Sequence, residues 1–255
     1  MMIGKDMATG SERVEPQDNL HTRTTRALAL RVIAAEDGAA ILPNEAQLCR
    51  ELGVSRTVVR ESIKVLANKG LVEVRTRTGT RVRPRSEWRL LDPDILGWRA
   101  QVRPDTAFLR DLCEVRLALE PTAAGFAALR ASAAELAALE GCLRRYEAAG
   151  RQGDKHALID LDLEFHRAVV AASRNSLLLE LSDSIRQPFR HVLSCTSRSA
   201  ANLQLGREAH SDLLAALERR DPLAARAVSE KIVGLAMIAV EQVIRRRGAP
   251  RKEPT

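Results

Sequence analysis

Aromatic residues are scarce in this 255-residue sequence, at 3% of the chain. With two Trp, one Tyr and four Phe, the hydrophobic cores have to be filled by Leu and Ala, which favours helices over sheets. Hydrophobic residues of all kinds make up 45% of the chain, enough for ordinary cores, and the length is typical of about two domains.

Cysteine and long hydrophobic runs are also scarce. The four Cys residues are Cys49, Cys113, Cys142 and Cys195. None forms a Cys-x-x-Cys pair, which predicts buried free thiols in a reducing compartment rather than disulfides or a zinc knuckle. The first ten residues lack the apolar stretch of a signal peptide, and the longest apolar run, Ile232–Val240, is too short to span a bilayer. We therefore expect a cytoplasmic protein without a membrane partner.

Positive charge is concentrated in one part of the chain. The formal net charge is +7, and residues 21–85 contain 13 Lys and Arg against 6 Asp and Glu. The rest of the chain has equal numbers of both signs. This distribution indicates a phosphate-binding module joined to an electrically neutral domain.

The basic segment shows the pattern of two helices joined by a short turn. Asn44 and Gln47 form a capping box for a first helix that ends at Gly53. Ser55 is a good N-cap for a second helix, whose apolar stripe continues to Gly70. The pattern predicts a helix-turn-helix unit, whose second helix enters the DNA major groove with its N-terminal end first.

Candidate DNA contacts lie at the start of the second helix and in the segment after it. Arg can bond both acceptors of a guanine edge, and Thr can reach a phosphate or a thymine methyl group. The residues at the helix start are Ser55, Arg56, Thr57 and Arg60. Residues 71–74 then alternate as a strand does, and a turn at Gly79 predicts a basic hairpin, or wing. The alternative is a small basic domain that packs on its own neighbour.

The stretch LPNEAQLCRELGVSRTVVRESIKVLANKGLVEVRTRTGTRV resembles the winged helix-turn-helix of the GntR transcription regulators, with a match from about residue 23 to residue 82. The resemblance implies recognition-helix contacts by Arg56, Thr57 and Arg60. It implies wing contacts by Thr76, Arg77 and Gly79. We expect a homodimer that binds a palindromic site on double-stranded DNA.

The rest of the chain has helical spacing of apolar residues from Asp105 onward. Ser132 and Glu135 open one helix with a capping box, Asp221-Pro222 begins the last helix, and Pro121 is expected to kink or restart a helix. Six to seven antiparallel helices would form an all-α bundle. The predicted fold class is therefore mostly α, with an N-terminal winged helix-turn-helix and a C-terminal helical bundle.

The predicted domain organisation follows these patterns. The segments are a disordered tail (1–20), the winged helix-turn-helix (21–83), a linker (84–104), the effector-binding and dimerisation bundle (105–247) and a tail (248–255). Trp88 and Trp98 in the linker are interpreted as hydrophobic anchors between the two domains. The sequence WRLLDPDILGW also resembles the linker of those GntR regulators that respond to sugar acids.

A candidate metal site lies in the predicted bundle. Asp162 and His166 are four residues apart in LDLEFHRAVV, so both side chains project from one helix face, which can be the bundle interior. Together with His210 on a later helix, they can bind a divalent cation of the zinc, nickel or manganese type. From the spacing alone, an ion pair between Asp162 and His166 is the alternative.

The region from about residue 108 to residue 240 resembles the FCD effector domain of GntR regulators. The matching motifs are D-x-x-F-H, A-S-x-N, E-x-H and D-x-x-x-A. The resemblance implies a metal held by an Asp and three His beside a pocket for a small carboxylate. Asp162, His166 and His210 match three of these ligands, but the fourth position is Ile232, which cannot bind metal.

The same resemblance points to Arg116, in an R-x-x-L-E motif, as an effector ligand. Its guanidinium suits bidentate recognition of a carboxylate. The alternative for Arg116 is an intrahelical ion pair with Glu120. Asn175 is either a donor in the pocket or a helix cap.

These observations favour a ligand-responsive transcription regulator that is not an enzyme. The most specific form is a repressor of genes for the catabolism of sugar acids of the galactonate kind, released from its operator by a small organic acid. One alternative is a metal-dependent hydrolase with a fused DNA-binding domain, because a three-ligand site leaves an open coordination position. The other is a DNA-binding protein that needs no effector.

Overall fold

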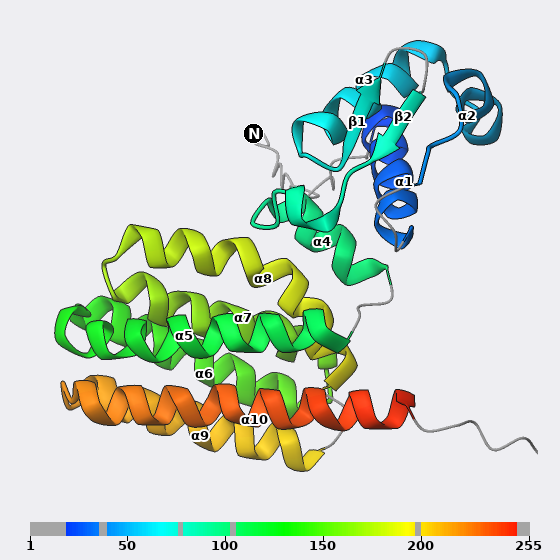
Figure 1. The fold of residues 1–255 in the computed structure, drawn as a ribbon. Coiled ribbons are helices and arrows are strands. Elements are labelled where there is room, and N and C mark those ends of the chain that lie inside the picture. The colour runs from blue at the N-terminus through cyan, green and yellow to red at the C-terminus, as the bar shows by residue number, and fades with distance from the viewer. Residues whose placement is uncertain (1–18, 36–39, 76–78, 103–105, 197–199, 249–255) are drawn as a thin grey trace, which may run out of the picture. The chain divides into compact units, whose positions relative to one another are not determined.

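The described part of the chain forms two compact units, residues 1–88 and residues 89–255 (Figure 1). The computed structural model describes residues 19–35, 40–75, 79–102, 106–196 and 200–248. The predicted tails at residues 1–18 and 249–255, and the predicted wing contacts Thr76 and Arg77, lie outside the described residues.

The first unit has three helices and a two-stranded sheet among its described residues. These elements are α1 (Leu20–Ala34), α2 (Glu45–Leu52), α3 (Arg56–Asn68), β1 (Val72–Arg75) and β2 (Gly79–Val82). Helix α1 packs on α3, and Leu28, Val32 and Leu66 are fully buried between these elements and the sheet. A buried hydrogen bond of 3.0 Å from Thr25 Oγ1 to Ser62 Oγ also joins α1 to α3.

The capping residues expected from the sequence define the two helices of the helix-turn-helix. The Asn44 side chain accepts from the backbone of Gln47, and the Gln47 side chain accepts from the backbone of Asn44, so the capping box is confirmed. Gly53 ends α2 in the left-handed conformation at φ 65°, which Gly adopts without strain. Ser55 caps α3 by accepting from the Val58 amide.

The predicted hairpin is present after α3. Strands β1 and β2 pair antiparallel, with Val72 opposite Val82 and Arg75 opposite Gly79. Val72 and Val82 are buried on the inner face of the hairpin. Because Gly79 has φ 85°, it lets the chain turn where a larger residue would be strained.

The second unit is a helical bundle. After a short 3-10 helix at Arg85–Glu87, which ends the first unit, the helices are α4 (Pro93–Gln101), α5 (Thr106–Arg130), α6 (Ala133–Gln152), α7 (Lys155–Ala172), α8 (Ser176–Thr196), α9 (Ala200–Glu218) and α10 (Pro222–Gly248). The mostly α fold is therefore confirmed. The expected restart at Pro121 is wrong, because α5 continues through it. The buried residues on both sides, Glu120 and Ala123, show that packing holds this helix together across the hydrogen bond that Pro cannot donate.

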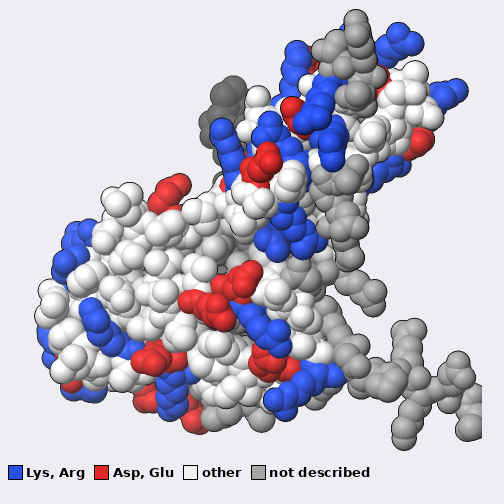
Figure 2. Space-filling view, in the orientation of Figure 1, with Lys and Arg blue, Asp and Glu red and all other residues white. Residues whose placement is uncertain are grey.

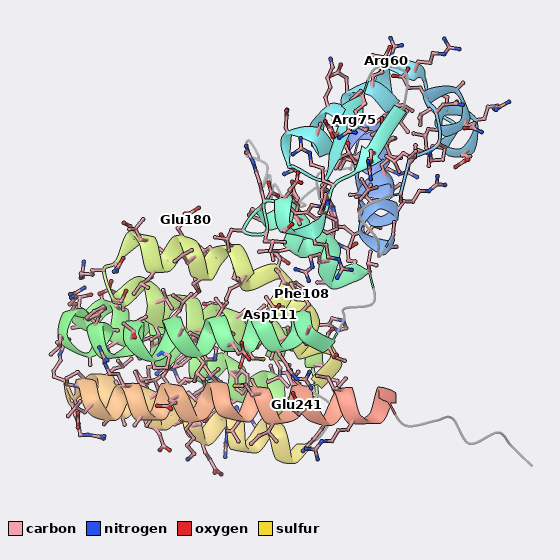
Figure 3. All side chains as sticks on the ribbon, in the orientation of Figure 1. Arg60, Arg75, Phe108, Asp111, Glu180 and Glu241 are labelled. Carbon is pink, nitrogen blue, oxygen red and sulfur yellow. The ribbon has the colours of Figure 1, made fainter. Side chains whose placement is uncertain are left out.

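Two hydrophobic clusters fill the bundle. One lies among the second half of α5, α6, α7, α9 and α10, and the other among α4, the first half of α5, α7, α8 and α10. Helices α5 and α10 run side by side (Figure 1). At their exposed edge, Arg110 binds Glu241 with both arms of its guanidinium, at 2.5 and 3.1 Å (Figure 3).

The two tryptophans belong to different units. The Trp88 indole donates to the Arg83 carbonyl at 2.9 Å, inside the first unit. Trp98 is buried on α4, which packs on α8. Their role as anchors between the units stays a prediction. None of the helices in the described ranges is long and apolar enough to cross a membrane.

Candidate functional site

The start of α3 presents the polar side chains that a recognition helix needs. Ser55, Arg56, Thr57 and Arg60 are all exposed, while Val59 on the opposite side of the helix is fully buried. This arrangement follows from the sequence, because the apolar stripe of α3 fixes which of its faces meets the core.

Arg60 is held in place by the preceding helix. Its Nε donates to Glu45 Oε2 at 2.8 Å, so α2 positions the guanidinium on α3. In the wing, Arg75 donates to Glu73 at 2.9 Å in the same strand. Lys and Arg side chains gather over this unit (Figure 2), with Arg60 on α3 and Arg75 at the end of β1 (Figure 3). Such a surface can neutralise DNA phosphates.

The three predicted metal ligands lie together inside the bundle. Asp162 and His166 are on α7, and His210 reaches them from α9, with all three ligand atoms within 4.8 Å of one another. The two imidazole Nε2 atoms are 3.1 Å apart. Asp162 oxygens lie 3.5 Å from His210 Nε2 and 3.9 Å from His166 Nε2. The structure thus joins residues that are 44 positions apart in the sequence.

Glu120 is a site residue that the sequence analysis weighed only as an ion-pair partner. Its Oε2 lies 2.9 Å from His166 Nδ1 and accepts a hydrogen bond from that nitrogen. This contact leaves His166 Nε2 facing Asp162 and His210. A carboxylate behind a ligating histidine fixes its tautomer and ring orientation in metal sites. The available sequence signal was an Arg and a Glu four residues apart on a helix whose other buried residues are mostly apolar.

Arg116 completes this buried network. It forms a two-armed ion pair with Glu120, with Nη2 to Oε2 at 3.0 Å. The guanidinium also lies over the Phe189 ring of α8, 3.7 Å from its centroid. The ion pair that the sequence analysis kept as an alternative is therefore present, and the two side chains are 4% and 9% exposed.

The electrostatics of the network favour a neutral His210 imidazole and a charged Glu120 carboxylate. Burial lowers the pKa of His210 to about 4, so its ring is neutral near pH 7. Burial opposes ionisation of Glu120, but Arg116 and His166 outweigh it and hold the pKa of this carboxyl below its ordinary value. Phe165 and Tyr146 pack edge-on against the His210 ring, and burial raises the pKa of the Tyr146 hydroxyl.

The donor set has the geometry of a divalent-cation site. Two imidazole nitrogens bound to one zinc ion at about 2.0–2.1 Å lie roughly 3 Å apart, as the two Nε2 atoms do here. The same distance also suits a hydrogen bond between one protonated and one bare nitrogen. Ile232 is 7% exposed and packs in the apolar cluster, so it supplies no fourth donor.

The two expected effector residues are not together. Arg116 lines a cavity of about 20 Å³ with Glu120, His166 and Phe189. Asn175 is not among the lining residues, and its side chain caps α8 by accepting from the amides of Leu177 and Leu178. The geometry of Asn175 is therefore that of the helix cap.

Comparison with known proteins agrees with both halves of this description. Residues 37–82 match the bacterial regulatory proteins of the gntR family, and residues 111–234 match the FCD domain. The chain is 34% identical over 181 residues to the galactonate operon transcriptional repressor of Escherichia coli K12, covering 71% of this chain and 78% of the repressor. The chain belongs to the GntR family. It is a GntR transcription regulator with an FCD domain, which implies DNA and a small-molecule effector as partners.

Another relative is also a transcription regulator, and one solved structure has a similar fold. The Glc operon transcriptional activator of Escherichia coli K12 is 29% identical, with 75% of this chain and 77% of the activator covered. A solved structure of Lar, which controls expression of the Listeria monocytogenes agr system, has a TM-score of 0.62 at 17% identity, with 91% of this chain and 99% of that chain covered. At that identity the structural likeness shows the fold alone.

The low pKa of His210 predicts a pH dependence of stability in the metal-free protein. The folded-state pKa of about 4 is below the ordinary histidine pKa of about 6.5, so the unfolded chain takes up protons first as the pH falls. Stability is therefore lost on acidification below the unfolded pKa. We expect His210 to contribute a loss of about 2 kcal/mol in unfolding free energy between about pH 7 and pH 5.

Urea unfolding in the presence of chelator at both pH values measures this loss. His210→Gln removes the titrating group, so its stability should change less over the same pH interval. An identical pH dependence in the wild-type protein and in His210→Gln would contradict the burial-lowered pKa.

Proposed function

We propose that this regulator represses genes for sugar-acid catabolism and leaves its operator when a small carboxylate binds the bundle. The observation that supports this most strongly is the likeness to the galactonate operon repressor, which extends across 71% of the chain. We propose repression rather than activation because that relative is a repressor. In this proposal the protein binds a palindromic operator as a homodimer, with Ser55, Arg56, Thr57 and Arg60 and the wing residues Thr76, Arg77 and Gly79 at the DNA.

The second part of the proposal is a divalent metal held by Asp162, His166 and His210. The neutral His210 ring, and the Glu120 contact that directs His166 Nε2 inward, support this role. When bound, the metal supplies coordination positions for effector oxygens, because the protein offers three ligands where family members have four. Glu120 orients His166, and Arg116 keeps Glu120 charged.

The effector carboxylate would meet the positive side chains around the small cavity. Arg116, Arg167 and Arg186 all line it. Arg116 is engaged with Glu120, and Arg167 binds Asp183 with both arms at 2.7 and 2.9 Å. A cavity of about 20 Å³ has room for about one water, so an acid can enter only if these side chains move. Movement of α7 and α8 is then coupled to binding, as a ligand-responsive regulator requires.

Arg56→Ala tests the DNA contacts. The exposed guanidinium at the start of α3 should contact a guanine edge, so its loss should weaken binding to the specific operator by about 1–3 kcal/mol. Fluorescence anisotropy on an operator selected by this protein from a random DNA pool measures the affinity.

Lys64→Ala is the matched control, because Lys64 is equally exposed on α3 but lies two turns further along and is paired with Glu61. Loss of the Lys64 side chain should weaken DNA binding less than loss of Arg56, and by the same amount for all DNA sequences. Equal operator affinity for Arg56→Ala and the wild-type protein would refute the assignment of Arg56.

Substitutions around the imidazoles test the metal site. His166→Gln and His210→Gln should abolish tight binding of zinc, nickel or manganese, while Glu120→Gln should weaken it about 10–100-fold by releasing the His166 ring. Isothermal titration of chelator-treated protein measures these affinities.

Glu164→Gln is the control on the same helix, because Glu164 is exposed and pairs with Arg145. If neither histidine substitution changes metal affinity, the two Nε2 atoms share a hydrogen bond and not a cation.

The effector is tested by thermal shift and operator release with aldonic, uronic and 2-keto-3-deoxy sugar acids. A true effector at a hundredfold excess over Kd stabilises the native state by about 2.7 kcal/mol. It should also lower operator affinity. Both effects should disappear in His166→Gln, which retains the DNA-binding unit. Sugar acids that neither stabilise the protein nor release the operator would leave a DNA-binding regulator with a different effector.

A further inference from the structure

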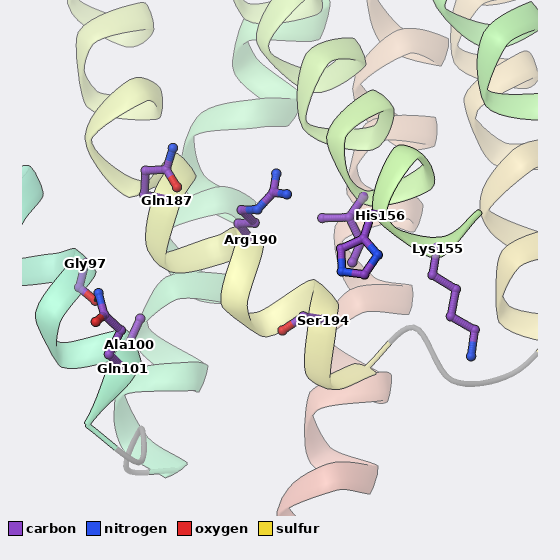
Figure 4. Close-up of a pocket in the computed structure, with 9 residues that line it drawn as sticks. Gly97, Ala100, Gln101, Lys155, His156, Gln187, Arg190 and Ser194 are labelled. Atoms are coloured by element: carbon purple, nitrogen blue, oxygen red, sulfur yellow. The ribbon is translucent and has the colours of Figure 1, made fainter. Parts of the chain in front are cut away.

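The bundle contains a second and much larger cavity at the end where α4, α7 and α8 meet (Figure 4). Its volume is about 420 Å³, within the range of about 300–1,000 Å³ that is usual for small-molecule sites. None of its lining residues also lines the small cavity beside His166. The two cavities are therefore separate.

The lining combines polar and apolar surface, with more of the apolar kind, and it includes positively charged side chains. Gln101 of α4, Lys155 and His156 of α7, and Gln187, Arg190 and Ser194 of α8 supply its polar groups. In Figure 4, these residues come from three different helices, and the Lys155 side chain points away from Arg190. Ile159 and Ala100 add apolar surface beside these polar groups.

The acidic groups around this cavity leave its positive charge only partly neutralised. Asp154 accepts from the amides of His156 and Ala157 as the N-cap of α7. Asp160 pairs with Arg190, and its side chain is 54% exposed. Lys155 forms no ion pair with any residue in the described ranges. Lys155 is therefore a positive charge without a carboxylate partner in the described ranges, whereas Arg190 shares its guanidinium with Asp160.

We propose that this cavity binds a small polyhydroxylated organic anion, carrying a carboxylate or a phosphate. The acid group would lie beside Arg190, and the exposed Lys155 side chain would turn toward it, since both offer charged donors. The hydroxyl groups would meet Gln101, Gln187 and Ser194, because amides and hydroxyls both donate and accept hydrogen bonds. A bound anion joins α4 to α7 and α8, and it gives the second unit a ligand site that does not depend on the histidine cluster.

Trp98 provides a local signal for occupancy, because it lies on α4 next to the lining residue Gly97. In a Trp88→Phe background it is the sole tryptophan. Its fluorescence is titrated with gluconate, with glucose 6-phosphate and with the neutral polyol sorbitol. We expect a saturable change with at least one of the two anions and none with sorbitol. The two anions distinguish a carboxylate from a phosphate as the preferred acid group.

Substitutions on either side of the cavity locate the signal. Lys155→Gln and Arg190→Gln should each weaken binding about tenfold or more, as expected for the loss of a charge-assisted hydrogen bond. Arg186→Gln is the matched control, because Arg186 is one turn before Arg190 on α8 and lines the other cavity. It should leave the Kd unchanged, and so should His166→Gln.

The proposal is overturned if neither anion changes the fluorescence, if sorbitol acts as the anions do, or if Lys155→Gln and Arg190→Gln keep the wild-type Kd. Loss of the signal in His166→Gln would also overturn it, because the anion would then bind at the histidine cluster. The proposed repressor function is tested separately by operator release, so either proposal can fail while the other stands.

Discussion

The shared carboxylate of Glu120 is the interaction on which the bundle site depends. It accepts from Arg116 on its own helix and from His166 on α7. Two buried charges are costly unless they are paired, and removing one partner of such a pair typically costs about 3–5 kcal/mol. The pair is also covered by Phe189 of α8. This carboxylate joins α5 to α7, and Arg116 adds the contact with α8, so a ligand that moves any of these helices would also move His166, one of the proposed metal ligands.

The DNA-binding unit relies on a different kind of interaction. Its contacts lie on the surface, where the apolar stripe of α3 determines which side chains face outward, and Glu45 positions Arg60. Exposed ion pairs of this kind contribute little to stability, about 0–1 kcal/mol. Such an ion pair instead orients the guanidinium, because sequence-specific DNA binding requires that a guanidinium meet a base edge at a defined angle. The chain thus separates an exposed, positively charged surface from a buried cluster of charged and imidazole side chains.

Local sequence signals predicted most of the fold, and long-range contacts account for what they missed. Capping residues such as Asn44, Ser55 and Ser132 act within three residues, so the sequence contains all the information needed to place the ends of their helices. Of the kink or restart expected at Pro121, the restart is wrong, because tertiary packing outweighs a lost helical hydrogen bond. Asp162 and His166 were recognisable as neighbours on one helix. The contact of Glu120 with His166, and the cavity among α4, α7 and α8, depend on how separate helices pack, which no local pattern contains.

The central claim is that Asp162, His166 and His210 form one metal centre whose geometry Glu120 maintains. X-ray absorption at the zinc edge of the zinc-loaded protein tests this most directly. We expect the zinc ion to have two imidazole nitrogens and a carboxylate oxygen as ligands at about 2.0–2.2 Å. Further oxygen atoms should occupy its remaining coordination positions. A shell with fewer than two imidazoles, or one containing sulfur from a cysteine, would contradict it.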